Sequence, residues 1–174
     1  LTNLKNYDIA KIQFLKLVNS SIASPEISLT VALLSIELND SDLAETYLNQ
    51  ALERGYQNPP QIFIYLAKIY YERNKLQDAI AYLDKIKSGG SFLESKLLAA
   101  QFISEKESVD SAIISLEGHQ NLSDAEQLKI LQFKTSLLYN NERKTESLDL
   151  MKKEEDNFKN SPEFKFDYAM LSDK

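Results

Sequence analysis

Few residues of this chain have the types and spacing that catalysis or metal binding requires. His119 is the only histidine among 174 residues, and the chain has no cysteine. Zinc takes three or four nitrogen, oxygen or sulfur ligands, so a single imidazole does not predict a metal site. The sequence neighbours of His119 also include no serine or carboxylate spaced to activate a nucleophile. We therefore expect His119 to be a buried or half-exposed structural side chain.

One acidic segment has the beginnings of a calcium-binding loop. Residues 39–42 read NDSD, but the glycine at loop position six and the glutamate at position twelve are missing. A short turn between two helices, with Asp40 or Ser41 as the N-cap residue, explains the segment better. We therefore expect no calcium site there.

The other polar motifs also have structural explanations. The run Lys152–Asp156 fits a solvated helix face, and the adjacent Glu154 and Glu155 point to different sides, so they cannot flank one glycosidic bond. The four glycines form neither of the glycine-rich loops that bind phosphate groups. Three N-x-S/T triplets carry little weight in a chain this rich in Asn and Ser; they begin at Asn19, Asn39 and Asn121. The sequence predicts no catalytic residue, no cofactor and no metal.

Composition narrows the classes of partner. A net charge of −6 and a pI near 4.9 argue against nucleic acid or an anionic membrane surface, because both attract basic proteins. No apolar run approaches the roughly 18 residues that span a bilayer. The absence of cysteine excludes disulfides but leaves the compartment open. Because the chain starts at Leu1 without a methionine or signal-like segment, we expect it to begin inside a longer protein.

The spacing of apolar residues predicts helices along the whole chain. In Gln61–Asn74 and in Leu76–Ile86, apolar side chains recur every three or four residues. Polar residues followed by proline predict helix starts, and glycines predict helix ends. These boundary residues are Ser24-Pro25, Asn58-Pro59 and Ser161-Pro162 for the starts, and Gly55 and Gly89-Gly90 for the ends. The sequence therefore predicts an all-α fold.

The helices form pairs that repeat about every 34 residues. Residues 27–48 align with residues 62–83 without a gap. A small residue recurs in both helices of each pair, at Ala32, Ala67, Ala100, Thr135 and Ala169 in the first helix and at Ala10, Ala44, Ala79, Ala112 and Ser147 in the second. Small residues let two helix backbones approach closely, so we expect helical hairpins that stack in series.

These residues resemble the tetratricopeptide repeat (TPR) family over essentially the whole chain. Residues 60–91 match the family frame with Phe63, Leu66-Ala67, Tyr70, Leu76, Ala79, Leu83 and Ile86. The unit at 128–158 departs from it, because Lys134, Thr135 and Lys144 stand where apolar or small residues are usual. The resemblance implies a right-handed α-solenoid of stacked antiparallel helix hairpins, that is, a TPR superhelix.

The repeat register predicts a single array over residues 1–174. It places the second helix of a partial repeat in 1–24, full repeats at 25–59, 60–92, 93–127 and 128–160, and the start of a further repeat at 161–174. This phase predicts a fragment of a longer solenoid. Segments 82–118 and 160–174 also loosely resemble long TPR proteins of the proteobacterial cell envelope. That likeness implies a bacterial periplasm or envelope, with the cytoplasm as the alternative.

The resemblance also implies which residues face a partner. In TPR arrays the first helices line a concave groove, and here the groove positions hold Leu33, Ile36, Ile64, Lys68, Tyr71, Leu97, Gln101, Gln132, Ser136 and Tyr139. Only Lys68 and Lys129 are basic at such positions, so the carboxylate clamp of co-chaperone TPR domains is not assembled. Tyrosine is a residue type that binding hot spots favour. The alternative for Leu33 and Ile36 is burial under adjoining helices.

The groove predicts a non-enzymatic scaffold that binds a protein or peptide segment. Two alternatives stay open. The chain could be the helical arm of an enzyme whose catalytic module lies elsewhere, or it could self-associate through the open ends of the array.

Overall fold

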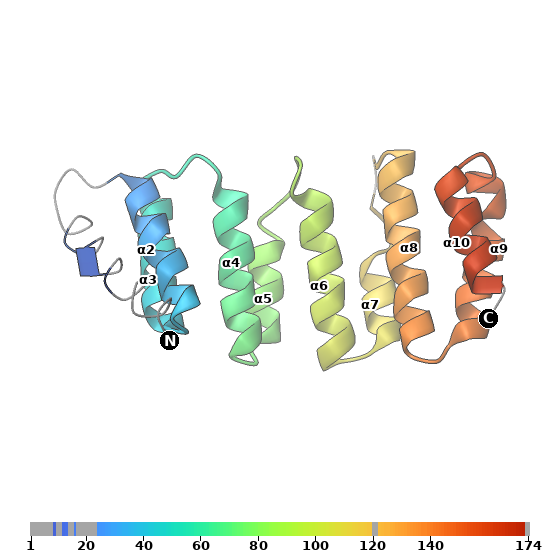
Figure 1. Ribbon diagram of the computed structural model, residues 1–174, viewed down its shortest axis with the longest axis horizontal. Coiled ribbons are helices and arrows are strands. Elements are labelled where there is room, and N and C mark those ends of the chain that lie inside the picture. Colours follow the sequence, from blue (N-terminus) through green and yellow to red (C-terminus); the bar gives the residue numbers. More distant parts are fainter. Residues whose placement is uncertain (1–8, 10–11, 14–15, 17–23, 120–121, 173–174) are drawn as a thin grey trace. The chain divides into compact units, whose positions relative to one another are not determined.

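The computed structural model describes residues 9, 12–13, 16, 24–119 and 122–172, and within these it is helical without strands (Figure 1). The helices are α2 (Pro25–Glu37), α3 (Ser41–Glu53), α4 (Pro59–Glu72), α5 (Leu76–Leu83), α6 (Phe92–Lys106), α7 (Val109–Ser115), α8 (Asp124–Asn140), α9 (Lys144–Phe158) and α10 (Pro162–Ser172). The all-α prediction is confirmed. Most of the partial repeat predicted in 1–24, including Ala10, lies outside the described residues. Within the described ranges, no helix is both long and apolar enough to cross a membrane.

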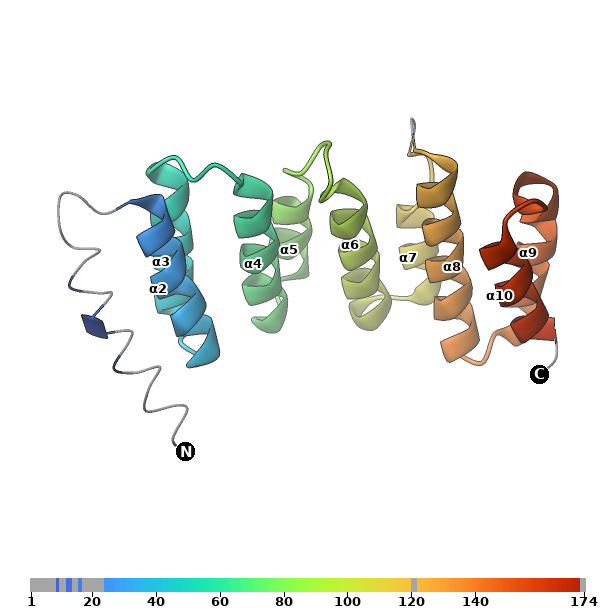
Figure 2. The same cartoon turned by 45° about the horizontal axis from the view of Figure 1, so that its top comes forward.

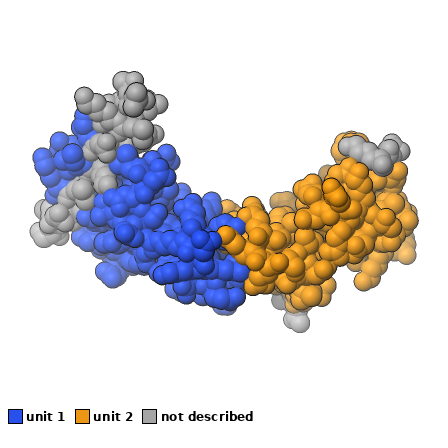
Figure 3. Space-filling view, turned by 90° about the horizontal axis from the view of Figure 1, so that it is seen from below, with its two compact units in different colours: residues 1–91 blue, residues 92–174 orange. Residues whose placement is uncertain are grey.

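The chain forms two compact units, residues 1–91 and residues 92–174 (Figure 3). In the first unit, α2 pairs with α3 and α4 pairs with α5, and α3 packs on α4. In the second unit, α6 pairs with α7 and α8 pairs with α9, while α8 also packs on α6 and α10 packs on α9. The two helices of each hairpin lie side by side in both views (Figures 1 and 2). The exact repeat boundaries and the continuity of one array over 1–174 stay predictions.

The small residues that mark the repeat lie inside the hairpins from α2 to α9, whereas Ala169 of α10 is exposed, against the expectation of close helix approach there. Six of them have no exposed surface, namely Ala32, Ala44, Ala67, Ala79, Ala100 and Ala112. In the α8/α9 hairpin their places are taken by Thr135 and Ser147, which are also buried. The Ser147 hydroxyl donates to the Thr135 carbonyl oxygen at 3.0 Å. Because this hydrogen bond satisfies the buried hydroxyl, the polar pair is tolerated where the other hairpins use alanine.

Three of the hairpins turn on a residue in the left-handed conformation. Asn39, Asn74 and Glu142 have φ values of 58°, 58° and 62° and follow α2, α4 and α8 respectively. The N–H of the next residue closes the turn onto the helix end, as from Asp40 to Ser35 at 2.8 Å and from Arg143 to Leu138 at 3.0 Å. This is the glycine-type helix ending, which asparagine accepts and glutamate does not favour.

Replacing Glu142 with asparagine should stabilise the second unit by about 0.5–1 kcal/mol, because asparagine relieves the left-handed strain. Urea unfolding followed by circular dichroism measures the gain. Glu142→Ala is the matched control, since it removes the same exposed carboxylate but keeps a side chain that the left-handed region disfavours. An equal gain in both variants would show that the carboxylate, and not the backbone, is the cause.

The helix ends agree with the sequence in part. Asp40 caps α3 by accepting from the Leu43 N–H at 3.2 Å, which confirms the turn interpretation of residues 39–42. Gly55 has φ 82° just beyond α3, as expected. Ser24 and Asn58 do stand at the N-cap positions of α2 and α4. However, neither side chain accepts a hydrogen bond from the first turn of its helix, so the predicted side-chain capping is wrong at both positions. The Ser24 hydroxyl bonds instead to the carboxylate of Glu26 and thereby lowers its pKa.

Two further boundaries differ from the prediction. Helix α5 ends at Leu83, well before Gly89, so the glycine pair lies in the following loop and does not end the helix. Helix α8 begins with a capping box that the sequence analysis missed. The Ser123 hydroxyl oxygen accepts from the Glu126 N–H at 3.3 Å, and the Glu126 carboxylate accepts from the Ser123 N–H at 2.9 Å. The S-x-x-E spacing was the signal for it.

Candidate functional site

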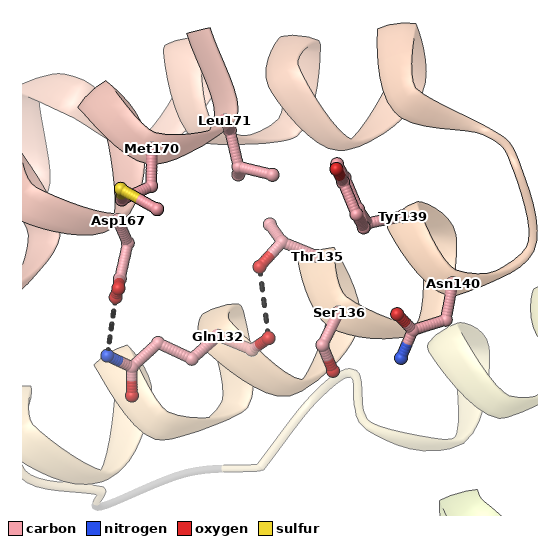
Figure 4. A pocket seen from close by; sticks show the side chains of 8 residues that line it. All are labelled: Gln132, Thr135, Ser136, Tyr139, Asn140, Asp167, Met170 and Leu171. Atoms are coloured by element: carbon pink, nitrogen blue, oxygen red, sulfur yellow. Dashed lines mark hydrogen bonds between the residues drawn. The ribbon is translucent and has the colours of Figure 1, made fainter. Parts of the chain in front are cut away.

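A cleft of about 280 Å³ lies between α8 and α10 in the second unit (Figure 4). Its lining residues come from one face of each helix and are Gln132, Thr135, Ser136, Tyr139, Asn140, Asp167, Met170 and Leu171. Gln132, Ser136 and Tyr139 are all among the predicted groove residues. The structure thus brings these three together, one helical turn after another along α8.

An aromatic cluster holds α10 in place beside this cleft. Phe164 is 1% exposed, and its ring stacks on Phe158 of α9 at 5.8 Å and on Tyr168 at 6.0 Å between centroids. The same core includes Leu128 and Leu131 of α8. Phe164 is the one side chain of α10 that is fully buried, and Tyr168 and Leu171 are partly buried against the same core, so this cluster positions one wall of the cleft.

Several polar side chains line the cleft, and one pair forms a hydrogen bond between its two helices. The Gln132 Nε2 donates to the Asp167 Oδ2 at 2.6 Å and so joins α8 to α10 (Figure 4). The hydroxyls of Thr135 and Ser136 donate to carbonyl oxygens of their own helix, at 3.0 and 2.8 Å. Both hydroxyls are therefore engaged with the backbone of α8.

Tyr139 and Met170 supply the apolar surface. Tyr139 is half-buried, and the ammonium of Lys144 lies 5.2 Å from its ring centroid. Lys144 departs from the family pattern, and this contact with the tyrosine ring gives it a structural role. Met170 is exposed on α10 at the cleft.

A second cleft, of about 390 Å³, lies between α8 and the segment from the end of α9 to the start of α10. It is lined by Asp124, Ala125, Leu128, Lys129, Gln132, Phe158, Ser161 and Glu163. Gln132 belongs to both clefts, so they adjoin there, and we call the residues of both together the α8/α10 groove. Hydrogen bonds from its own backbone N–H and from the Ser161 hydroxyl lower the pKa of Glu163.

The predicted groove residues of the first unit lie in different environments. Leu33 and Ile36 are half-buried and pack against the core of α2, α3 and α4, which favours the alternative that they are covered. Ile64 is 8% exposed and therefore offers little surface to a partner. Lys68 is exposed and Tyr71 is half-buried. A binding role for these five residues stays a prediction.

Of the two predicted groove residues on α6, one is packed against the core and the other is exposed. Leu97 is half-buried against the core that α6 shares with α7 and α8. Gln101 is exposed, and its side-chain amide donates to Glu105 on the same helix at 2.9 Å. His119 is half-buried, as expected, with its ring edge-on to Phe92 at 5.8 Å. In the part of the chain that the structure describes, no group of three His, Cys, Asp or Glu side chains could hold a metal ion.

Sequence reasoning missed the α10 side of the groove. Asp167 and Met170 face the cleft, but the predicted groove positions stopped at Tyr139 in the preceding repeat. The repeat spacing could have identified them, because Asp167 and Met170 lie one repeat after the groove residues Gln132 and Ser136 of α8.

It also missed ion pairs that join one hairpin to the next. Arg73, at the end of α4, contacts Asp42 of α3 at 2.6 Å and also pairs with Glu45. In the second unit Arg143 contacts Asp110 of α7 at 2.9 Å. Asp42 and Asp110 each stand two residues before the small residue of their helix, so the acidic partners hold equivalent positions two repeats apart.

The pairing around Glu45 predicts a dependence of stability on pH. Burial alone would raise the pKa of Glu45, but hydrogen bonds from Tyr70 and Arg73 and the charge of Arg73 outweigh burial and lower it below the usual 4.5. Because the pKa is lower in the folded chain, this contribution to stability is present above pH 4.5 and is lost as the pH falls through the folded value.

We therefore expect Glu45→Gln to lower the free energy of unfolding at pH 7 by about 1 kcal/mol and to reduce its fall between about pH 5 and pH 3. Urea unfolding followed by circular dichroism at pH 7, 5 and 3 measures the free energy of unfolding of each variant. Glu53→Gln, at an exposed position of the same helix, is the control and should leave the pH dependence unchanged. Parallel curves for Glu45→Gln and the unmodified chain would contradict the assignment.

Comparisons with solved structures identify the fold. The C-terminal part of a TPR repeat-containing protein from Cytophaga hutchinsonii superposes with a TM-score of 0.64 at 20% identity, over 92% of this chain and 62% of that one. YrrB, described as a TPR protein with an unusual peptide-binding site, gives 0.57 at 12% identity, over 92% and 82%. The Naa15/Naa10 structure bound to HypK-THB gives 0.61 at 18% identity, over 99% and 27%.

At these identities the likeness shows the fold alone, and it confirms the α-solenoid of TPR type. No protein-family model matches the chain, and no curated protein matches it. The chain spans 62% of the length of the Cytophaga hutchinsonii structure. The likeness to proteobacterial envelope proteins, and the location that it implies, stay predictions.

Proposed function

We propose that this chain is a non-enzymatic protein-interaction scaffold whose α8/α10 groove binds a segment of a partner protein. The observation that carries the proposal is the cleft between α8 and α10, in which three predicted groove residues meet Asp167 and Met170. Peptide-binding grooves typically combine an apolar surface with a few placed polar groups. The cleft has both.

The side chains of the groove suit an extended or helical segment. Gln132 and Asn140 carry amides, each of which both donates and accepts hydrogen bonds and so can pair with a peptide backbone. Tyr139 offers an aromatic contact, and Met170 offers a flexible apolar one that adapts to different side chains. A related use of the fold supports the proposal, since YrrB is described as having a peptide-binding site.

The test begins with peptides selected from a random phage-displayed library on the chain 1–174. Tyr139→Ala and Asn140→Ala are expected to weaken a selected peptide by about ten-fold or more, as measured by calorimetry. Asn160→Ala is the matched control for the asparagine, because Asn160 is exposed and lies outside the groove. Helicity and melting temperature of Asn140→Ala should stay those of the unmodified chain.

Two outcomes would contradict the proposal. One is the failure of the library to yield any binder. The other is that every selected peptide binds the Tyr139 and Asn140 variants as tightly as the unmodified chain. Binding lost on Lys68→Glu or Tyr71→Ala instead would move the site to the groove predicted in the first unit.

A further inference from the structure

Acidic side chains outnumber basic ones in the α8/α10 groove. Its lining includes three carboxylates, those of Asp124, Glu163 and Asp167, and one ammonium, that of Lys129. Lys129 lies in the cleft that also holds Asp124 and Glu163, whereas Asp167 is the only charged residue lining the other cleft. A partner segment that enters the groove therefore meets a net negative surface, and like charges facing each other there would oppose binding.

Asp167 has capacity for a further bond. It is half-buried, and its Oδ2 accepts from the neutral amide of Gln132 at 2.6 Å. An ionised carboxylate offers about four acceptor positions on its two oxygens. Within residues 24–119 and 122–172, no lysine or arginine forms an ion pair with Asp167. The amide fixes the orientation of this carboxylate, and no lysine or arginine among the described residues pairs with its charge.

The residues beside Asp167 suit the stem of a long basic side chain. Met170 and Leu171 follow it on α10 and line the same cleft. Arginine and lysine bury their methylene stems along such apolar surface while the charged head reaches a partner. Arginine fits better than lysine, because its planar fork pairs with both oxygens of a carboxylate.

We propose that the partner segment of this groove carries an arginine that pairs with Asp167 and lays its stem on Met170 and Leu171. This inference rests on the proposed function, because it names the chemistry of the segment that the groove binds. An acidic segment, of the kind that a carboxylate clamp binds, is the occupant that it excludes.

Three dipeptide probes test the inference directly on the ¹⁵N-labelled chain 1–174. They are acetyl-Leu-Arg-amide, acetyl-Leu-citrulline-amide, which has the same shape without the charge, and acetyl-Leu-Glu-amide. Titration followed by amide chemical shifts should show the arginine probe perturbing α8 and α10, with an affinity about ten-fold higher than the citrulline probe. The glutamate probe should leave these amides unchanged.

Asp167→Asn should abolish the preference for arginine over citrulline. This variant keeps the side-chain shape and an oxygen that accepts from Gln132, so the cleft should persist. Glu155→Gln removes the same charge from an exposed position of α9 outside the groove and should leave the preference intact.

The inference and the proposed function fail in different ways. Equal binding of the arginine and citrulline probes, or an unchanged preference in Asp167→Asn, overturns the arginine pairing. Phage-selected peptides that still depend on Tyr139 and Asn140 would then leave the scaffold function standing. Shifts confined to residues outside α8 and α10 also overturn the pairing.

Discussion

Phe164→Ala is expected to cost about 3–4 kcal/mol of stability in the second unit and to detach α10. Phe164 is the largest side chain that the structure buries almost completely, and it is stacked between Phe158 and Tyr168. Truncation to alanine removes this apolar burial and both ring contacts, and it leaves a cavity beside α8 and α9. Helix α10 is short, and its other contacts with this core, from Tyr168 and Leu171, are only partly buried, so they compensate for little of the loss.

The measurement is hydrogen exchange of the α10 amides, together with urea unfolding. Phe166→Ala is the matched control, because Phe166 stands two residues later on the same helix and is 66% exposed. It should change stability by less than about 0.5 kcal/mol. Detachment of α10 would also separate Asp167 from Gln132, so Phe164→Ala should lose peptide binding although Phe164 does not line the groove. Equal effects of the two variants would contradict the role given to the aromatic cluster.

Ala79→Leu is expected to destabilise the first unit by about 2–3 kcal/mol. Ala79 has no exposed surface and lies in α5 of the hairpin that α4 completes with the equally buried Ala67. A leucine at position 79 has no space unless α4 and α5 move apart. Such a movement would also disrupt the packing of the buried side chains between the two helices. Urea unfolding followed by circular dichroism measures the loss.

Two variants make this result specific. Ala81→Leu adds the same side chain at an exposed position of α5 and should change stability by less than about 0.5 kcal/mol. Ala79→Ser adds one small atom and should cost less than about 1 kcal/mol, because Ser147 occupies the matching position of the α8/α9 hairpin. A tolerated leucine at position 79 would show that close helix approach does not determine the position of the small residue.

The fold could be predicted because its information is local and repeated. The small residues, from Ala32 to Ser147, recur at one spacing, and the same contact between helices demands them each time. A residue that departs from the repeat pattern also fits into the fold. Lys134 is 14% exposed along its side chain, yet its stem occupies the apolar position while its ammonium reaches toward Glu117 at 3.9 Å. Burial lowers the pKa of Lys134, but the hairpin still forms.

The site could be predicted only in part, because it depends on contacts between hairpins. The register correctly led to Gln132, Ser136 and Tyr139 as neighbours on one face of α8. It did not reveal that Ile64 is buried, since that follows from how closely the adjacent helices pack. Nor could spacing alone show that Gln132 bonds to Asp167, because a hydrogen bond across two helices depends on side-chain conformations that a repeat pattern does not specify.

The attachment of α10 through a single fully buried side chain also sets an order of mechanical failure in the second unit. A pulling force applied at Ser172 acts first on α10, which contributes Phe164 and the partly buried Tyr168 and Leu171 to the core. The α8/α9 hairpin resists longer, because both of its helices contribute to the core and Ser147 is bonded to Thr135. Tension would therefore open the α8/α10 groove before it unravelled a hairpin, so that a load on the chain would change the groove while most of the helices stayed intact.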